Sequence, residues 1–420
     1  MSLLIRTVNV IGMGYIGLPT ATVLAENGFR VHGTDVNEAT VSAISAGSVP
    51  FAEPDLAAHV ERAVRSGELT ASSRPVEAHA YVIAVPTPFL EDRTPDVSFI
   101  EAATRAIAPH LKGGCLVILE STSPPGTTEK VGRWIRDLRP DLIDDNDSLT
   151  VQLAHCPERV LPGRVMVELI TNDRIIGGVT PDAAIAARSL YATFCDGDIH
   201  LTDARTAELA KLVENSYRDV NIAFANELAL IADRLQVDVW EVIRLANRHP
   251  RVNVLQPGPG VGGHCIAVDP WFIVDAAPDL ARLIRTAREV NDAKPSWVLS
   301  KVRNALAGAD APIIAALGLS FKPDIDDLRE SPARSIVAAI ADEFTGGRVL
   351  VVEPNITALP SELKNRRNVE LVALAEAAAR ADLVVLLVDH RDFRLADPSA
   401  LGIAVDQLID TRGIWSRLSR

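Results

Sequence analysis

The sequence predicts an α/β protein in which two doubly wound domains are joined by a helical middle with one long connecting helix. Three observations lead to this fold class. Short apolar, β-rich runs alternate with helical segments in residues 1–200 and again in residues 301–420, a pattern typical of parallel sheets covered by helices. A glycine-rich turn follows the first predicted strand. The segment from Asp203 to about Leu235 has helical periodicity without glycine or proline, so we expect residues 201–300 to form a central helical domain.

The N-terminal domain is expected to begin with a strand, a helix that Gly28 ends, and a second strand. Two further buried runs, each followed by a proline- or glycine-rich turn, predict two more strands. The predicted strands are Thr7–Ile11, Arg30–Thr34, Tyr81–Val85 and Cys115–Glu120, and the helix is Leu18–Asn27.

The rest of the chain continues these patterns. Asp203 is the expected N-cap of the long helix, and two shorter helices are predicted at Val239–Asn247 and Leu280–Asn291. The C-terminal domain repeats the strand–helix alternation, with strands at Pro312–Leu317, Arg348–Val352, Leu383–Val388 and Val405–Ile409 and helices at Pro332–Phe344 and Leu374–Ala381.

The composition argues against several classes of function. The 420 residues are 48% hydrophobic and 23% charged, with a net charge of −13, which argues against a general nucleic-acid or membrane-surface binder. No apolar run approaches the roughly 18–20 residues that cross a bilayer, and the N-terminus has no signal-peptide pattern. The four cysteines lie far apart, which suits neither a metal site nor a disulfide framework. We therefore expect a cytoplasmic protein without a metal cofactor or a membrane partner.

The glycine-rich turn has the pattern of a dinucleotide-binding loop. Gly12, Gly14 and Gly17 form GxGxxG between a strand and a helix, with Tyr15 and Ile16 inside the motif. Asp35 ends the next strand, where an acidic side chain accepts from a ribose 2′-hydroxyl and repels a 2′-phosphate. The sequence therefore predicts NAD as cofactor, against the alternative of a purely structural turn with a solvated aspartate.

Three more loops follow predicted strands, where ligands of doubly wound sheets bind. The first contains Pro86 and Thr87, the second is Glu120–Thr128 with Thr122, and the third is Cys156–Arg159 with Glu158. Each of them, taken alone, is equally consistent with an ordinary turn.

Cys265 is the candidate nucleophile. It follows four glycines, and Asp269 lies four residues on; a helix that began near Cys265 would lower the pKa of its thiol. Lys211 and Asn215 share one face of the long helix, where they can stabilise an oxyanion, although a solvated helix face explains the spacing equally well. His264 precedes the thiol and receives no catalytic role, because adjacent side chains rarely face each other.

Six ordered motifs now resemble the UDP-glucose/GDP-mannose dehydrogenase family over essentially the whole chain. They are Gly12–Gly17, Ser121–Thr128, Cys156–Arg159, Lys211–Asn215, the glycine-rich loop of Cys265, and Phe321–Ser331. The resemblance implies two Rossmann-like domains and an NAD-dependent four-electron oxidation of a UDP-sugar, in which the C6 alcohol becomes a carboxylate through a thiohemiacetal and a thioester on Cys265. Residues 247–271 are most similar to family members that act on UDP-N-acetyl-D-mannosamine, with UDP-N-acetylglucosamine and UDP-glucose as alternatives. His264 and Val268 differ from the residues common in UDP-glucose enzymes.

The resemblance also implies roles for individual residues. The catalytic set comprises Cys265, Lys211, Asn215, Asp269, Thr122 and Glu158, with the general base left open between the two carboxylates. Cofactor contacts are expected from Gly12, Gly14, Tyr15, Ile16, Gly17, Asp35, Pro86, Thr87, Thr122 and Arg329. Substrate contacts are expected from Glu158, Arg159, Val160, Lys211, Asn215, Arg251, Gly262, Lys322 and Arg412.

Two other functions compete with this interpretation. A two-electron hydroxy-acid dehydrogenase would share the glycine turn and a catalytic lysine but would not need Cys265. A catalytically silent nucleotide-sugar-binding protein would keep Asp35 and Lys322 and lose the catalytic groups freely. The long amphipathic helix further predicts a homodimer, because it would expose apolar surface in a monomer.

Overall fold

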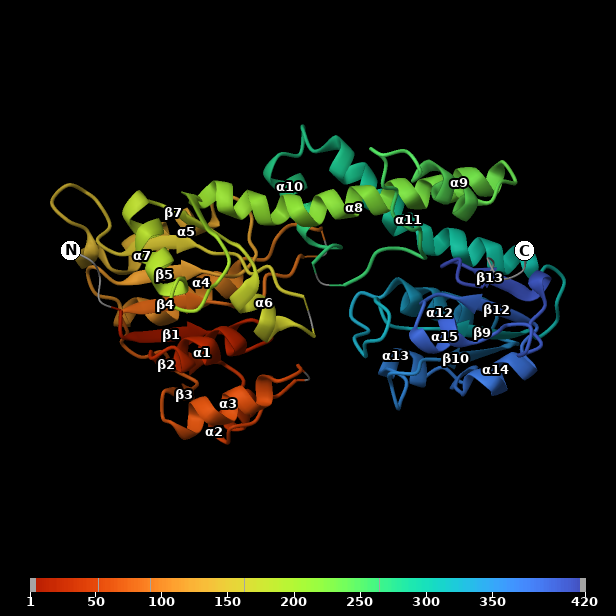
Figure 1. The fold of residues 1–420 in the computed structure, drawn as a ribbon, viewed down its shortest axis with the longest axis horizontal. Helices are drawn as coiled ribbons and strands as arrows, with labels where there is room; N and C mark the ends of the chain where they lie inside the picture. The colour runs from red at the N-terminus through yellow and green to blue at the C-terminus, as the bar shows by residue number, and fades with distance from the viewer. Residues whose placement is uncertain (1–4, 52, 91, 162, 264, 416–420) are drawn as a thin grey trace. The chain divides into compact units, whose positions relative to one another are not determined.

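The computed structural model describes residues 5–51, 53–90, 92–161, 163–263 and 265–415 (Figure 1). The chain forms two compact units. The first contains the residues up to Glu214 together with Trp271–Ala276, and the second contains Asn215–Pro270 and the residues from Ala277 onward. The boundary between the expected central and C-terminal domains, at residue 300, stays a prediction.

The first unit is built on an eight-stranded sheet of order β3-β2-β1-β4-β5-β6-β7-β8. Every neighbouring pair is parallel except β6 and β7, which are antiparallel. The strands are β1 Thr7–Ile11, β2 Arg30–Thr34, β3 Leu69–Ser72, β4 Ala80–Ile83, β5 Leu116–Leu119, β6 Gln152–His155, β7 Arg174–Gly178 and β8 Ile199–Asp203. The helices are α1 Gly17–Glu26, α2 Glu38–Ser45, α3 Leu56–Arg65, α4 Ser98–Ile107, α5 Thr127–Leu138, α6 Val165–Thr171 and α7 Pro181–Tyr191.

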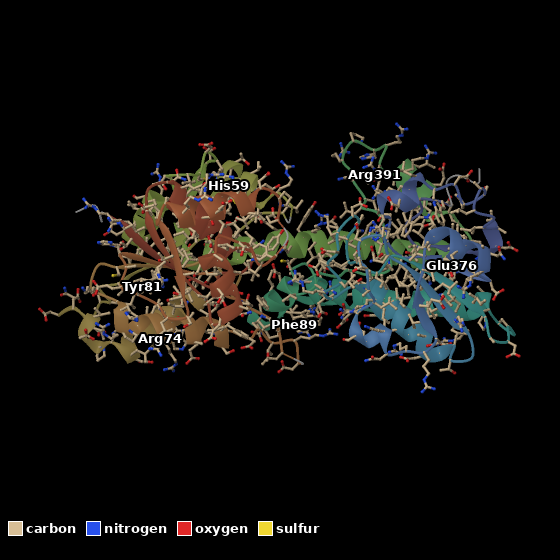
Figure 2. All side chains as sticks on the ribbon, turned by 90° about the horizontal axis from the view of Figure 1, so that it is seen from below. His59, Arg74, Tyr81, Phe89, Glu376 and Arg391 are labelled. Carbon is tan, nitrogen blue, oxygen red and sulfur yellow. The ribbon has the colours of Figure 1, made fainter. Side chains whose placement is uncertain are left out.

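Successive residues of the central strands enter separate cores on the two faces of this sheet, because side chains alternate along a strand. Val82 of β4 belongs to a core that also contains residues of α1, α3, α6 and α7, whereas Tyr81 and Ile83 belong to a core with residues of α4 and α5. Burial on both faces explains why these strands read as continuous apolar runs. Figure 2 shows Tyr81 among the strands of the first unit, and Glu376 and Arg391 at the outside of the second.

The second unit contains a five-stranded parallel sheet of order β11-β10-β9-β12-β13. Counted outward from β9, its strands follow the same order as β3-β2-β1-β4-β5 counted outward from β1 in the first unit. The predicted pair of doubly wound domains is therefore confirmed. The strands are β9 Ile313–Leu317, β10 Arg348–Val352, β11 Val369–Leu371, β12 Leu383–Leu386 and β13 Leu408–Asp410, and the helices are α12 Pro332–Glu343, α13 Ser361–Lys364, α14 Leu374–Arg380 and α15 Arg391–Leu395.

The helical middle contains the long helix that the sequence predicts. Helix α8 spans Ala204–Arg234, and the backbone N–H of Thr206 donates to the Asp203 carboxylate (2.9 Å), as expected of an N-cap. It is followed by α9 Val239–Ala246, α10 Asp269–Ala276 and α11 Arg282–Ala305. Within the described ranges, no helix is both long enough and apolar enough to cross a membrane.

Two predicted elements differ from the structure. The helix predicted at Leu280–Asn291 begins at Arg282 and continues to Ala305 with Pro295 inside it. A proline removes one backbone donor from the helix, but packing of Val298 and Val302 against the second sheet stabilises the continuation. The strand predicted at Val405–Ile409 is wrong in its first half, since Val405–Gln407 is a 3₁₀ turn and β13 begins at Leu408.

A buried polar cluster lies at the carboxyl end of β5. Glu120 accepts hydrogen bonds from the Tyr191 hydroxyl (3.0 Å) and the Thr20 hydroxyl (3.2 Å). Burial, with a further contribution from the nearby carboxylate of Glu158, raises the pKa of Glu120 to about 8. Glu120 is therefore protonated in the folded chain at neutral pH, where an unfolded chain would have it ionised.

This raised pKa predicts a pH dependence of stability. Because the folded state holds the Glu120 proton up to about pH 8 and the unfolded state releases it near its ordinary pKa of 4.5, this group makes the free energy of unfolding fall as the pH rises between those values. The slope for one proton is at most about 1.4 kcal/mol per pH unit. Glu120→Gln carries no such proton, so urea titrations should find the variant gaining stability relative to the parent from pH 5 to pH 8. An unchanged difference across that range would contradict the assignment.

Candidate active site

The glycine turn after β1 has the close approaches that the dinucleotide interpretation requires. Gly12 has φ +91°, and a Cβ there would lie 2.5 Å from the Ala84 carbonyl oxygen. A Cβ on Gly17 would lie 1.8 Å from the Gly12 carbonyl oxygen, so α1 packs closely on the turn. A Cβ on Gly14 would meet no protein atom within 4 Å. The surface at Gly14 is therefore open to a ligand, as a pyrophosphate requires.

Asp35 lies directly after β2, beside this turn. Its carboxylate accepts from the backbone N–H of Met13 (2.8 Å) and of Asn37 (2.8 Å). A carboxylate has about four acceptor positions, so these bonds leave capacity for the two hydroxyls of a ribose. The half-buried side chain thus fits NAD, and it would repel the extra phosphate of NADP.

Glu53 is a residue that the sequence interpretation missed. Its carboxylate accepts from the hydroxyl of Tyr15 in the glycine motif, and from the backbone N–H groups of Gly163 and Val165 (both 2.9 Å). Glu53 therefore joins the glycine turn to the loop that carries Glu158, Arg159 and Val160. No sequence signal identifies it, since it lies 38 residues from one partner and more than 100 from the others.

The loops after β4 and β5 lie together, as expected for neighbouring parallel strands. The Thr87 hydroxyl donates to the carbonyl oxygen of Thr122 (2.6 Å), and the Ser121 hydroxyl donates to that of Val85 (2.7 Å). Pro86 is exposed, and Thr87 and Thr122 are half-buried. The two threonines are therefore fixed to each other at the carboxyl edge of the sheet.

Glu208 of α8 holds the far end of the β5 loop. It accepts from the backbone N–H of Gly126 (2.5 Å) and from both the N–H and the hydroxyl of Thr128 (2.7 Å each), which satisfies donors at the start of α5. Burial raises the pKa of Glu208, although these hydrogen bonds oppose the shift. Glu208 precedes Lys211 by three residues, so one turn of α8 fixes the loop and presents Lys211.

The third loop carries two charged side chains that already have protein partners. The carboxylate of Glu158 contacts the buried guanidinium of Arg174 (3.3 Å) and accepts from the Arg159 backbone N–H (2.7 Å). Arg159 itself pairs with Glu214 (2.6 Å). Val160 packs against the core of the first unit. Glu158 is thus held in one orientation by Arg174, a second residue that spacing alone did not identify.

The second unit brings three candidate catalytic residues together. Cys265 is exposed, and its carbonyl oxygen accepts from the backbone N–H groups of Val268 (3.0 Å) and Asp269 (2.8 Å). Helix α10 therefore begins at Asp269, one turn after the cysteine rather than at it. The Asn215 amide donates to the buried carboxylate of Asp269 (2.5 Å). His264 lies outside the described residues.

The glycine-rich loop packs on the Phe321–Ser331 segment. A Cβ on Gly262 would lie 2.4 Å from the Glu330 carbonyl oxygen, and one on Gly263, with φ +85°, would lie 2.9 Å from the Phe321 ring. Close packing therefore requires glycine at both positions. Lys322, in the same segment, is exposed.

The three arginines of the second unit that are expected to contact ligands differ in their exposure and in their partners. Arg329 is exposed and pairs with Asp327 (2.6 Å). The Arg412 guanidinium donates to Asp389 (2.8 Å) and to the Pro257 carbonyl (3.3 Å), next to the glycine-rich loop. Arg251 is exposed in the turn after α9. Among the described residues, no three His, Cys, Asp or Glu side chains are grouped to hold a metal ion.

The open surface at Gly14 yields a test of the cofactor site. A methyl group there clashes with no protein atom but occupies the space that a pyrophosphate needs, so Gly14→Ala should weaken NAD binding at least about tenfold. Its melting temperature and UDP affinity should match the parent protein. Gly12→Ala is the contrasting variant, since its Cβ clashes with Ala84 and should lower the melting temperature. An NAD affinity unchanged by Gly14→Ala would contradict the assignment.

Comparison with known proteins finds three domains of one family, in order along the chain. Residues 6–195 match the NAD-binding domain of the UDP-glucose/GDP-mannose dehydrogenase family, residues 205–293 its central domain, and residues 315–417 its UDP-binding domain. An NDP-N-acetyl-D-galactosaminuronic acid dehydrogenase of Ralstonia nicotianae is 58% identical, over 98% of this chain and 96% of the relative. A UDP-N-acetyl-D-mannosamine dehydrogenase of Escherichia coli is 54% identical, over 97% and 99%.

Solved structures agree with this grouping. A UDP-D-ManNAc dehydrogenase from Pyrococcus horikoshii superposes with a TM-score of 0.86 at 38% identity, over 97% of this chain and 96% of that one. A UDP-glucose dehydrogenase from Pyrobaculum islandicum gives a TM-score of 0.84 at 27% identity, over 98% and 95%. The glycine turn, the half-buried Asp35 and the matched domains together identify NAD as the cofactor. The chain belongs to the UDP-glucose/GDP-mannose dehydrogenase family and is an NAD-dependent UDP-sugar dehydrogenase.

Proposed function

We propose that this protein oxidises UDP-N-acetyl-D-mannosamine at C6 to the uronate, in two successive two-electron steps. The observation that carries the proposal is the group formed by Cys265, Asp269 and Asn215: an exposed thiol one turn before α10, and a buried carboxylate held by an amide. Such a thiol has no role in a two-electron alcohol oxidation, but it is needed to retain an aldehyde for a second oxidation.

In the first step, a base or an activated water takes the C6 hydroxyl proton. NAD, held at the turn of Gly12, Gly14 and Gly17 and by Asp35, would supply the hydride acceptor for each of the two oxidations. Lys211 and the Asn215 amide stabilise the developing oxyanion by charge and by hydrogen bonding. Asp269 and Glu158 are the two candidate bases or water-positioning groups, and each has a partner that fixes its orientation, Asn215 and Arg174 respectively.

In the second step, the Cys265 sulfur adds to the aldehyde carbon and forms a thiohemiacetal. Loss of hydride converts it to a thioester, and water then cleaves the carbon–sulfur bond, releasing the carboxylate and restoring the thiol. Thr122, whose carbonyl oxygen accepts from the Thr87 hydroxyl, would help to orient this water. Covalent capture keeps the reactive aldehyde from escaping while the reduced cofactor is exchanged.

A second candidate substrate comes from the Ralstonia relative, which is named an NDP-N-acetyl-D-galactosaminuronic acid dehydrogenase and is 58% identical to this chain. Both candidates are nucleotide sugars with a 2-acetamido group and differ in stereochemistry. The four-electron chemistry is the same for either sugar.

The deciding experiment counts NADH formed per limiting sugar nucleotide in the presence of excess NAD. UDP-N-acetyl-D-mannosamine should yield two NADH, and UDP-N-acetylglucosamine, UDP-N-acetylgalactosamine and UDP-glucose should yield little. One NADH per sugar would remove the thioester route. Two NADH from another sugar would leave the mechanism standing and overturn the choice of substrate.

Cys265→Ser is the matched control for the role of the thiol. A serine hydroxyl is a far weaker nucleophile than a thiolate, so the variant should bind UDP and NAD as the parent does but lose at least about a thousandfold in four-electron turnover. Full turnover by the variant would contradict the covalent mechanism.

We also propose that the protein is a homodimer through α8. Tyr217, Phe224 and Ile231 recur at seven-residue spacing on one face of this helix and are 71%, 59% and 47% exposed. An apolar stripe of this kind on a long helix is typical of a helix–helix interface.

The dimer is tested by sedimentation at micromolar concentration. The parent protein should sediment as about twice the 45.1 kDa of one chain. Phe224→Glu should weaken association at least about tenfold, because a buried charge in an apolar interface is costly. Arg218→Glu, which changes an exposed side chain away from the stripe, should leave association unchanged. A purely monomeric parent would contradict the proposal.

A further inference from the structure

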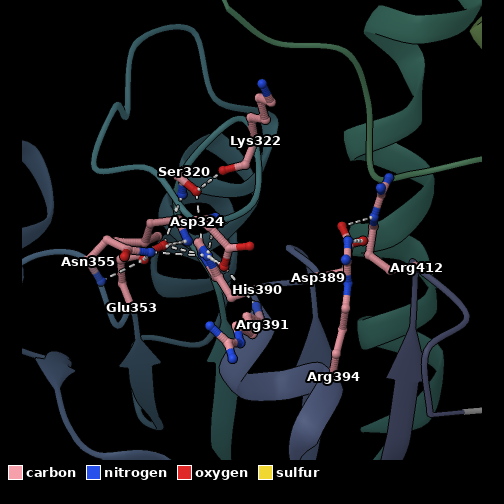
Figure 3. Close-up of polar contacts among 11 residues, drawn as sticks. Ser320, Lys322, Asp324, Glu353, Asn355, Asp389, His390, Arg391, Arg394 and Arg412 are labelled. Atoms are coloured by element: carbon pink, nitrogen blue, oxygen red, sulfur yellow. Dashed lines mark hydrogen bonds and ion pairs between the residues drawn. The ribbon is translucent and has the colours of Figure 1, made fainter. Parts of the chain in front are cut away.

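Two adjacent residues after β12, Asp389 and His390, contact the segments that carry Lys322 and Arg412, the two cations expected to contact the substrate (Figure 3). His390 contacts the segment of Lys322, and Asp389 contacts Arg412. Both are buried, and neither was identified from the sequence.

His390 has a defined hydrogen-bonding state. Its Nδ1 lies 2.9 Å from the backbone nitrogen of Asp324, and a backbone N–H can only donate, so Nδ1 is the acceptor. Its Nε2 lies 3.0 Å from a carboxylate oxygen of Glu353 and is therefore the donor. The same oxygen of Glu353 accepts from the backbone N–H groups of Leu319 (2.7 Å) and Ser320 (3.1 Å).

The contact at Asp324 supports an uncommon backbone conformation. Asp324 has φ +62°, in the left-handed region that only a few per cent of non-glycine residues adopt. Besides the bond from its N–H to His390, its carboxylate accepts from the Arg391 backbone N–H (2.8 Å). The Ser320 hydroxyl donates to the Lys322 carbonyl (2.7 Å), which ties the lysine backbone to the same cluster. Figure 3 shows the Lys322 side chain extending away from this cluster.

Asp389 orients the side chain of Arg412. One of its oxygens accepts from Arg412 Nε (2.8 Å), and the other pairs with Arg394. These bonds hold Arg412 with its Nη1 near the Pro257 carbonyl, where the glycine-rich loop begins.

We propose that Asp389 and His390 are positioning residues that set where Lys322 and Arg412 stand to bind the diphosphate of the sugar nucleotide. Two cations recognise a diphosphate only at a suitable separation, and residues adjacent in the chain provide a common reference point for both. The inference rests on the proposed function for its ligand, and it assigns to these two residues no contact with the substrate.

Two substitutions at His390 separate its two hydrogen bonds. His390→Asn keeps an acceptor at the Nδ1 position, facing Asp324, and loses the donor to Glu353. His390→Gln keeps a donor at the Nε2 position and loses the acceptor for Asp324. By calorimetry with UDP, His390→Gln should raise the Kd about tenfold and His390→Asn about twofold at most. An equal loss in both variants would overturn the role of the Asp324 contact.

Three further variants complete the test. Asp389→Asn should raise the UDP Kd several-fold, with the NAD Kd and kcat unchanged. Asp324→Gly removes the acceptor for Arg391 while glycine adopts the left-handed backbone without strain, so it loosens the segment without threatening the fold and should raise the UDP Kd about tenfold. Arg391→Ala is the matched control. Its exposed side chain is removed but its backbone N–H remains, so its UDP affinity should equal that of the parent.

The positioning role and the proposed function are contradicted by different outcomes. If the parent binds UDP, and Asp389→Asn and Asp324→Gly bind it with the same Kd, the positioning role is overturned and the proposed function stays intact. A parent protein that does not bind UDP would instead contradict the proposed function. A rise in the KM for NAD equal to that for the UDP-sugar would indicate a general loss of structure and would overturn the inference.

Discussion

The candidate site depends on one kind of interaction, a carboxylate that accepts backbone N–H groups from a neighbouring loop. Asp35 holds Met13, Glu53 holds the start of α6, Glu208 holds the start of α5, and Glu353 holds the turn after β9. Hydrogen bonds to an ionised acceptor are shorter and about twice as strong as neutral ones. Loops that must present backbone to a ligand cannot pair that backbone in a sheet, so side-chain carboxylates supply the missing partners.

Each of the two sheets has such a carboxylate, but the two carboxylates have different roles. Asp35 and Glu353 each follow the second strand of a doubly wound sheet and accept from the turn after the first strand. Asp35 is half-buried and keeps acceptor capacity for a ribose. Glu353 is buried, and its oxygens accept from His390, from the side chain of Asn355 and from three backbone N–H groups. Burial alone would raise the pKa of Glu353, but the hydrogen bonds from His390 and Leu319 outweigh it and lower the pKa. Glu353 therefore serves as a structural anion, and the proposed diphosphate contacts in the second unit are instead cations on its loops.

The fold could be predicted well from the sequence because it depends on local patterns, and the candidate catalytic residues were named from local signals of the same kind. The β1 turn, the long α8 and the alternation of strands and helices need only neighbouring residues to be recognised. The cysteine, Asn215 and Asp269 could be named from residue type and spacing, and the structure brings the last two into contact. Local rules failed at Pro295, where tertiary packing overrides a helix breaker, and at Val405–Gln407, where a short apolar stretch forms a 3₁₀ turn.

The residues that hold the site in place could not have been found in this way. Glu53, Glu208, Arg174 and His390 act on partners that are 16 to 112 positions away, and each is an ordinary polar residue in its own segment. Their significance appears only when folding brings distant loops together. Sequence therefore identifies candidate catalytic groups more readily than the groups that orient them.

An acidic chain that binds anionic ligands also requires an explanation. The net charge of −13 disfavours a nucleoside diphosphate at long range, but salt screens exposed charges beyond roughly 8–10 Å. At short range, Arg412 is paired with Asp389, which reduces its net attraction for phosphate. Its contacts with Asp389 and Pro257 use two of the five N–H groups of an arginine. The paired carboxylate thus lowers the charge of the site and orients the donors that remain. Specific recognition of a diphosphate depends on that orientation more than on net charge, because free phosphate and other anions in the cell compete equally well for an unoriented cation.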